Sequence, residues 1–333
     1  MYGSKTDRSV SPGRWLRASP LLVGVVLLAA ACGSSTGSSS ASISPPTPTT
    51  TLRIGFIPVV ESAPLYLANQ LGYFQSEHLK VQLDSQQTAA AIVPSLLNGQ
   101  LQVGVSATVP FTLAVSKGLP LRAIATIGNG GPKESAIVVK PGSGITTPAQ
   151  LAGKTVAVNQ LDAVLQLVTL ADIAKHGGNA STAKFIALPF PSAISAVKSG
   201  RVDAATVVEP FTTIAAQSGL DVIARPYPDV LPPKANIAVA FVTNAYLAAH
   251  RTALSGFVRA LNRATQFAAT HPNAVRQAVT KYTTISPKLA ESINLPAFVP
   301  SLTASSIEPT LQLMVQFHFL SKAPSASALM TSP

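Results

Sequence analysis

The stretch Lys198-Ser-Gly-Arg-Val-Asp-Ala-Ala-Thr-Val-Val-Glu-Pro-Phe211 is typical of a helix end, a tight turn, a buried strand and the beginning of a new helix. Gly200 suits the left-handed residue that ends a helix. The apolar run 202–208 is typical of a strand covered on both faces of a parallel sheet. Glu209 and Pro210 then lie where the strand meets a helix. Open α/β sheets bind ligands at that edge, so the stretch predicts an α/β fold with a site there.

A second stretch of the same kind occurs earlier, at Asn98-Gly-Gln-Leu-Gln-Val-Gly-Val-Ser-Ala-Thr-Val-Pro110. Here too a glycine follows a predicted helix, an apolar strand comes next, and a proline lies near the beginning of the following helix. Two such copies predict two similar lobes that face each other across a cleft.

Predicted strands and helices alternate through most of the chain, which implies two mainly parallel sheets. We expect lobe 1 to comprise residues 52–140 and 237–320, with a helical C-terminal region, and lobe 2 to comprise residues 141–236. The chain then crosses between the lobes twice, and a double-crossover hinge permits closure around a ligand. Residues 321–333 are predicted to be a loose tail.

Composition bounds the class of protein. A chain of 333 residues with 47% hydrophobic and 11% charged residues has enough apolar material for two domains. Its formal charge is +11, and a basic surface can bind nucleic acid. Aromatic residues, however, are only 6% and do not interleave with the basic ones. We therefore expect a solvated basic surface near an anionic membrane and no nucleic-acid partner.

The N-terminus has the pattern of a secretory signal peptide. Residues 1–17 are basic, and the apolar run 21–31 is shorter than the ~20 residues that span a bilayer. Leu28-Ala-Ala-Ala-Cys32 resembles the bacterial lipoprotein signal, in which the cysteine is acylated and becomes the mature N-terminus. The interpretation is a signal peptide at 1–31 with lipidation at Cys32. The alternative is an ordinary cleavage site with an incidental thiol.

Cys32 is the only cysteine, so a disulfide within the chain is excluded. The residues that follow, to position 51, are almost entirely Ser, Thr, Pro, Gly and Ala, which cannot bury enough apolar surface to fold. We expect residues 32–51 to be a disordered tether between a lipid and a folded body that begins near Leu52.

Five phrases, in order, resemble the solute-binding proteins of ABC importers in the nitrate, sulfonate and taurine group, which are also similar to binders of thiamine pyrimidine precursors. They are Ser62-Ala-Pro-Leu-Tyr-Leu-Ala68, Gly72-Tyr-Phe-Gln-Ser-Glu-His-Leu-Lys-Val81, Asn98-Gly-Gln-Leu-Gln-Val-Gly104, Leu151-Ala-Gly-Lys-Thr-Val-Ala-Val158 and Ser199–Phe211. The resemblance implies a two-lobed type II periplasmic-binding-protein fold, secretion to the outer face of the cytoplasmic membrane, and a monomer that delivers a small solute to an ABC permease. The chain departs from the family at Gln102, where Asp is common.

Four predicted helix beginnings face the proposed cleft, near Ser62, Thr108, Asp162 and Glu209. Free N–H groups and a partial positive charge of roughly half a unit allow such ends to hold an oxyanion. The alternative is that these residues only stabilise their helices. Glu61 and Glu209 would instead favour an amine, so a zwitterion such as an aminosulfonate would satisfy both features. Either glutamate could also make a local cap or hinge hydrogen bond.

The predicted ligand-binding residues are Phe56, Pro58, Glu61, Ser62, Ser106, Thr108, Asn129, Asn159, Asp162, Glu209 and Phe211. The two phenylalanines could stack on a ligand or pack in the core. Asn129 lies within Gly128-Asn-Gly-Gly131, a glycine-rich turn where backbone can approach a ligand closely.

Enzyme signatures are absent from the sequence. Gly153-Lys-Thr155 lacks the preceding glycine of a phosphate loop, because position 148 is proline. The five histidines have no metal-ligand spacing, and no Gly-x-Ser-x-Gly motif occurs. We therefore expect no catalytic residues, metal or cofactor. Three alternatives stay open: a binder of a thiamine pyrimidine precursor or another small heteroaromatic, an enzyme on the same fold, and a non-transport surface protein that uses the cleft for a peptide or partner. Thiamine-pyrimidine synthases, however, carry a cysteine-rich motif that a single-cysteine chain lacks.

Overall fold

The computed structural model describes residues 48–86 and 89–333. The predicted signal peptide at 1–31, the predicted lipidation site Cys32 and the tether as far as residue 47 lie outside this part. The first strand begins at Thr50, inside the predicted tether, because its backbone pairs with the strand that starts at Leu79. Within the described residues, no helix is both long and apolar enough to cross a membrane.

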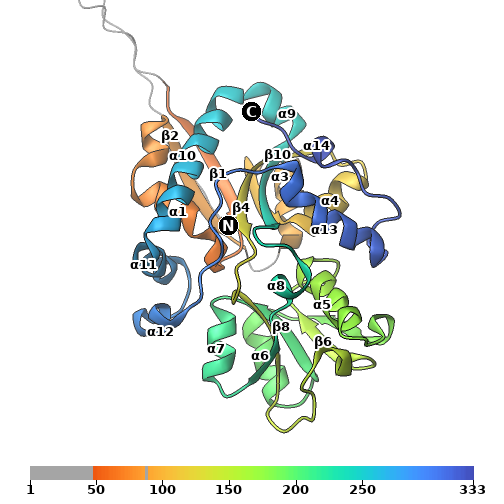
Figure 1. The fold of residues 1–333 in the computed structure, drawn as a ribbon. Coiled ribbons are helices and arrows are strands. Elements are labelled where there is room, and N and C mark those ends of the chain that lie inside the picture. The colour runs from red at the N-terminus through yellow and green to blue at the C-terminus, as the bar shows by residue number, and fades with distance from the viewer. Residues whose placement is uncertain (1–47, 87–88) are drawn as a thin grey trace, which may run out of the picture. The chain divides into compact units, whose positions relative to one another are not determined.

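The first sheet has five strands, four of them parallel. In spatial order they are β2 (Leu79–Ser85), β1 (Thr50–Phe56), β3 (Val103–Ala107), β10 (Asn236–Thr243) and β4 (Leu121–Asn129). Only β10 runs antiparallel to its neighbours. The strand Ile237–Thr243 that the sequence predicted to return to this sheet is therefore β10, which lies between β3 and β4 (Figure 1).

The second sheet repeats this arrangement. Its order is β7 (Lys184–Ala187), β6 (Thr155–Val158), β8 (Ala204–Val208), β5 (Ser135–Val139) and β9 (Asp221–Ala224). Here β5 is the antiparallel strand. β8 is fully buried and lies between β6 and β5. The apolar run 202–208 therefore contributes a central strand, as predicted. The prediction of two mainly parallel sheets is confirmed.

Two segments join the sheets. Residues 130–134 lead from β4 to β5, and residues 225–235, with the short helix α8 (Pro226–Val230), lead from β9 to β10. The predicted boundary between lobe 1 and lobe 2 at residue 140 is wrong, because the chain has already entered the second lobe at Ser135. β5 pairs along its whole length with β8, so it belongs to the second lobe. An apolar strand carries no local mark of which sheet it joins, and this pairing is long-range.

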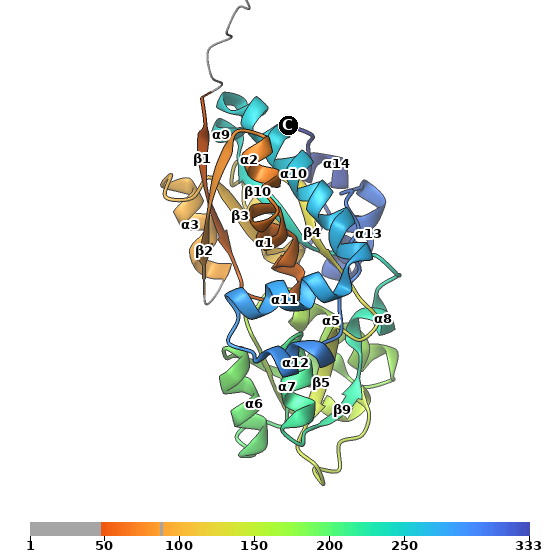
Figure 2. The same cartoon turned by 90° about the vertical axis from the view of Figure 1, so that its left-hand side faces the viewer.

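Helices cover both sheets. In the first lobe they are α1 (Ala63–Gln70), α2 (Tyr73–Ser76), α3 (Ile92–Leu97), α4 (Thr108–Ser116), α9 (Asn244–Ala249), α10 (Arg251–Thr270), α11 (Pro272–Tyr282), α12 (Pro287–Ser292) and α13 (Ala304–Gln316), with 3-10 turns η1 (Val60–Ser62) and η2 (Ala89–Ala91). In the second lobe they are α5 (Val164–Lys175), α6 (Phe190–Lys198), α7 (Phe211–Gln217) and α8, with 3-10 turns η3 (Pro148–Leu151) and η4 (Ala180–Thr182). α12 packs against α7 and so connects the C-terminal region with the second lobe (Figure 2).

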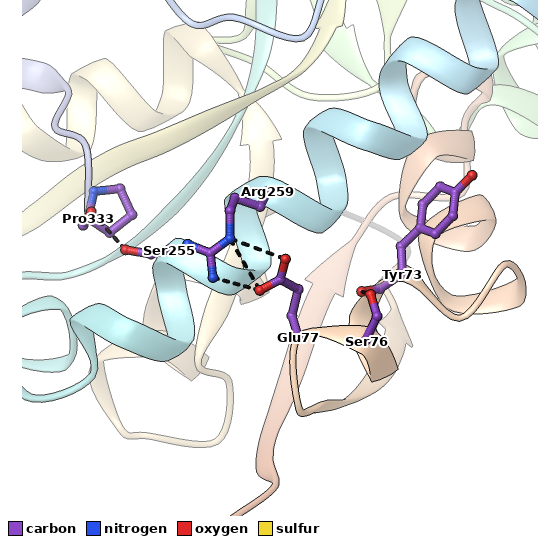
Figure 3. Close-up of polar contacts among 6 residues, drawn as sticks. All are labelled: Tyr73, Ser76, Glu77, Ser255, Arg259 and Pro333. Atoms are coloured by element: carbon purple, nitrogen blue, oxygen red, sulfur yellow. Dashed lines mark hydrogen bonds and ion pairs between the residues drawn. The ribbon is translucent and has the colours of Figure 1, made fainter. Parts of the chain in front are cut away.

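The long helix α10 has the apolar face that its sequence predicted. Phe257 is fully buried and stacks on Phe74 of α2, with ring centroids 5.5 Å apart. On its exposed side, Arg259 forms a bidentate ion pair with Glu77, the shortest N–O distance being 2.6 Å (Figure 3). The pair and the stacked rings fix α2 against α10.

The C-terminal segment differs from the predicted loose tail. The helix α14 (Ala326–Leu329) buries Leu329 completely. The N–H of Thr331 then donates to the carbonyl of Ala123 on β4 over 2.9 Å. The hydroxyl of Ser255 donates to the carbonyl of Pro333 over 2.9 Å (Figure 3). The tail is held because it satisfies the free edge of β4 and covers apolar surface.

Candidate functional site

A cavity of about 80 Å³ lies between the strand ends of the two sheets. Its walls come from the loop after β1, from β3, β4, β8 and β10, from the segment after β6, and from the beginnings of α4 and α5. A single water needs roughly 10–15 Å³ of such space, so the cavity suits a solute of few non-hydrogen atoms.

The first lobe supplies three polar side chains to the cavity. Glu61 and Ser62 lie in η1, and Ser106 is the penultimate residue of β3. The hydroxyl of Ser62 donates to the carbonyl of Ile57 over 2.8 Å, which fixes the turn. Ser106 Oγ is buried and has no hydrogen-bond partner among the described residues. Because a buried hydroxyl without a partner is costly, Ser106 is available to a ligand.

The second lobe presents amides and a helix beginning. Asn159 and Gln160 follow β6 and line the cavity, as do Ala163 to Leu165 at the beginning of α5. Ala163 precedes this helix and provides no side-chain cap, so the first N–H groups of α5 stay free for another acceptor. Phe190 closes this side and stacks on Phe211, with centroids 4.8 Å apart.

Glu61 has a second glutamate behind it. Glu134, at the end of the first crossover, is fully buried, and Glu61 is 6% exposed. The N–H of Gly131 donates to one Glu134 oxygen over 2.8 Å. If both groups were ionised, each side chain would have one buried oxygen that accepts no hydrogen bond. A proton held by one of the two groups would supply a donor for the other.

Burial places that proton on Glu134. Burial and then the charge of Glu61 raise the pKa of Glu134 well above its ordinary value. Burial also raises the pKa of Glu61, but the hydrogen bond from Glu134 opposes that rise. Of the two groups, Glu134 has the more strongly raised pKa, so it keeps its proton to higher pH than Glu61 does. The described residues that line the cavity include no Lys, Arg or His to neutralise the charge of Glu61.

Four of the eleven predicted site residues line this cavity: Glu61, Ser62, Ser106 and Asn159. Pro58 lies between two lining residues, Ile57 and Val59. Three of the four predicted helix beginnings border the cavity, and the one after Glu209 does not. That helix starts at Phe211 and not at Pro210.

The other predicted residues lie elsewhere. Phe56 is fully buried in the core of the first lobe. Thr108 donates to the side-chain oxygen of Asn236 over 2.6 Å, and Asn129 donates to the carbonyl of Lys234 over 2.7 Å. Asp162 is exposed with a φ of 53°.

Glu209 and Phe211 serve the interior. Glu209 is fully buried, and its carboxylate accepts hydrogen bonds from Thr213 and Asn294. The ring of Phe211 stacks on that of Phe190, which lines the cavity. These contacts match the alternatives given for the two residues. Glu209 makes a local hydrogen bond at the hinge, and Phe211 packs against another aromatic ring.

Sequence reasoning missed Glu134, Tyr227, Phe190 and Gln160. Tyr227 belongs to α8, a five-residue helix that was not predicted, and it lines the cavity from the second crossover. The glycine-rich turn at 128–131 was interpreted as a close approach to a ligand. The structure shows a close approach to Glu61 instead, because a Cβ at Gly128 would lie 2.9 Å from the Glu61 side chain.

No group of three or more metal-ligating His, Cys, Asp or Glu side chains occurs in the part of the chain that the structure describes. The site is therefore built from the carboxyl group of Glu61, hydroxyls, amides, free helix N–H groups and apolar walls. It can hold a small solute by hydrogen bonds and charge.

Comparison with known proteins supports this view of the fold. A family model described as NMT1/THI5 like matches residues 60–275, which is more than half of the chain. No curated protein matches the sequence. Among solved structures, the alkanesulfonate-binding protein SsuA from Xanthomonas axonopodis pv. citri, bound to MOPS, has a TM-score of 0.74 and 21% identity, covering 86% of this chain and 100% of that one.

Two further structures are similar at lower identity. The ligand-binding component of an ABC-type import system from Staphylococcus aureus has a TM-score of 0.74 and 14% identity, covering 85% of this chain and 97% of that one. The nitrate-binding protein NrtA from Synechocystis PCC 6803 has a TM-score of 0.71 and 14% identity, with 84% coverage of both chains. These similarities confirm the predicted type II periplasmic-binding-protein fold.

Proposed function

The chain belongs to the NMT1/THI5-like family, and from that premise we propose that it is the solute-binding component of an ABC importer. The observation that carries the proposal is the cavity between two lobes that are joined by a double crossover. A solute in this position contacts both lobes, so it can stabilise a closed form that a permease would recognise. Binding, and not catalysis, is the function of the site.

We propose a small organic anion or zwitterion of the sulfonate, taurine or nitrate type as the solute. The free N–H groups at the beginning of α5 suit an oxyanion, because the helix dipole adds favourable charge there. Ser106 and Asn159 add neutral hydrogen-bonding groups. The similar proteins from Xanthomonas and Synechocystis bind, by their names, an alkanesulfonate and nitrate.

The location follows from the N-terminal pattern together with the family. We propose that residues 1–31 direct secretion and that Cys32 is acylated, which would hold the chain on the outer face of the cytoplasmic membrane. Metabolic labelling with a fatty-acid analogue tests this step. Wild-type chain should carry the label and the Cys32→Ser variant should not, whereas equal labelling would contradict acylation at this residue.

A thermal-shift panel tests solute binding. Residues 33–333 would be heated with taurine, alkanesulfonates, nitrate and carboxylates. A ligand at a hundred times its dissociation constant adds ~2.7 kcal/mol to the free energy of unfolding. For a chain of this size that corresponds to a rise in Tm of roughly 4–5 °C. The absence of a shift with every solute would contradict the proposal.

One observation favours a second class of solute. Phe190 and Tyr227 both line the cavity and give it two aromatic walls. A small heteroaromatic such as a thiamine pyrimidine precursor could stack there, since aromatic pairs prefer offset or edge contacts. Pyrimidines in the same panel distinguish the two classes. Conversion of a bound solute to a product, followed by NMR, would instead support the enzyme alternative.

A further inference from the structure

Glu61 places a buried carboxyl group in the cavity wall, and no Lys, Arg or His among the described residues lines the cavity beside it. Its Oε2 atom has no hydrogen-bond partner among the described residues, and its side chain lines the cavity. A buried carboxylate without a positive partner is strongly unfavourable, because burial removes its hydration. In a binding protein, such a group is stable when the ligand supplies the missing charge.

We propose that the cavity contains a subsite for a cationic nitrogen, in which the unpartnered oxygen of Glu61 pairs with a protonated amine of the solute and Glu134 holds Glu61 in place. This inference rests on the proposed function and makes its solute class narrower. The solute must carry an ammonium group as well as an acid group, so nitrate and simple alkanesulfonates do not satisfy the site.

The groups that face Glu61 are all neutral or acidic. Behind it lies Glu134, and Glu209 from the second lobe adds a repulsive negative charge. Tyr282 of α11 donates its hydroxyl to the carbonyl of Val59 over 3.1 Å and so does not neutralise Glu61. Tyr227 of α8 is buried next to both carboxyl groups.

Arg225, a half-buried cation at the second crossover, is engaged elsewhere. Its guanidinium donates to the backbone carbonyls of Lys133 and Ser135, at 2.8 and 3.3 Å. No ion pair to Glu61 occurs within residues 48–86 and 89–333, so we expect the solute to supply the positive partner.

Glu134 is a positioning residue in this arrangement. It does not line the cavity, and Gly131 donates to one of its oxygens. Its other oxygen is buried and has no partner among the described residues, and in the proposed arrangement it donates a hydrogen bond to Glu61 that directs that carboxylate at the solute. Glutamine can donate the same hydrogen bond from its amide, whereas leucine cannot.

The experiment compares matched solutes that differ only in the amine. Calorimetry on wild-type protein would use 2-aminoethanesulfonate against ethanesulfonate, and 3-aminopropanoate against propanoate. We expect the amine-bearing member to bind at least tenfold more tightly in at least one pair. Its affinity should also fall on acidification, as Glu61 takes up a proton. Both measurements use wild-type protein and need no variant.

Variants then assign the preference to its residues. Glu61→Gln should abolish the preference for the amine and flatten its pH dependence. Glu134→Leu should weaken binding of the amine-bearing member, and Glu134→Gln should restore much of it. Glu308→Gln, which changes an exposed glutamate on α13, is the control and should match the wild type.

The outcomes separate this inference from the proposed function. Equal or tighter binding of the deaminated members by wild-type protein would overturn the cationic subsite and leave the proposed function standing. An undiminished amine preference in Glu61→Gln would also overturn it. If none of these four compounds binds but another solute of the thermal-shift panel does, the cationic subsite fails and the proposed function stands. If no solute of the panel binds, both proposals fail.

Discussion

Asn294 Nδ2 lies 2.6 Å from Oε1 of Glu209, and the backbone N–H of Asn294 donates to the same oxygen over 3.1 Å. These bonds connect the segment after α12 with the junction of β8 and α7. Gln217 of α7 also donates to Ser292 Oγ over 3.1 Å. The C-terminal region is thus fastened to the second lobe by a buried carboxylate that the sequence had suggested as a ligand contact.

Replacing Asn294 with alanine should weaken the contact between the C-terminal region and the second lobe. Hydrogen bonds to a charged group contribute about 1.5–3 kcal/mol, so Asn294→Ala should lower the free energy of unfolding by that order. If the contact forms only when the lobes are closed, solute affinity should fall by roughly tenfold for each 1.4 kcal/mol lost. Urea unfolding and calorimetry measure the two effects. Asn244→Ala, at an exposed helix position, is the control, and an Asn294→Ala protein equal to it in both assays would contradict the prediction.

The proton on Glu134 predicts how stability depends on pH. Because its pKa is raised in the folded state, folding favours the protonated form. That contribution is complete below the ordinary pKa of glutamate and is lost as pH rises toward the folded pKa. Relative to wild type, Glu134→Gln should gain about 1.4 kcal/mol per pH unit across this window. Urea unfolding at several values between pH 5 and pH 8 checks the slope.

If the free energy of unfolding changed with pH in the same way for wild type and Glu134→Gln, Glu134 would be ionised in the folded protein. Glu308→Gln should give that parallel behaviour, because this side chain is exposed. The comparison therefore measures the proton of one buried carboxyl group and excludes a general effect of removing negative charge.

The sequence alone predicted the units of the fold in which a helix, a tight turn and a buried strand follow one another. Gly200 has the left-handed φ of 73° that its position after α6 predicted, and Gly99 has a φ of 78° after α3. Both belong to local patterns in which a helix, a turn and a buried strand follow one another. Such patterns depend on neighbouring residues, so a single sequence reveals them.

The site was less predictable because its central contact is not local. Glu61 was recognised as a candidate, but its partner Glu134 follows a glycine-rich turn that has an ordinary loop interpretation. Nothing in the residues around Glu134 indicates that it meets Glu61, since the two belong to different segments that only the folded chain brings together. The tail after Ser321 was missed for the same reason, because its contacts are with β4 and α10.

Gly128 should be required for the shape of the site. A Cβ at this position would lie 2.9 Å from both Cβ and Cγ of Glu61, which is too close for either atom to stay in place. Gly128→Ala should therefore displace Glu61, lower the free energy of unfolding by about 1–3 kcal/mol and weaken solute binding. Gly130→Ala is the matched control, because its Cβ would meet Tyr227 at 3.4 Å. Normal affinity in a folded Gly128→Ala protein would show that the position of Glu61 does not matter for binding.

The C-terminal segment should contribute to the stability of the first lobe. Leu329 is fully buried, so Leu329→Ala should cost about 2–5 kcal/mol through lost burial and a cavity. The N–H of Thr331, which donates to Ala123 on β4, should then exchange faster with deuterium, because the segment that holds it is loosened. Leu97→Ala, at a leucine that is 46% exposed, should cost much less. If Leu329→Ala were as stable as Leu97→Ala and kept its protection at Thr331, the segment would not be a packed part of the lobe.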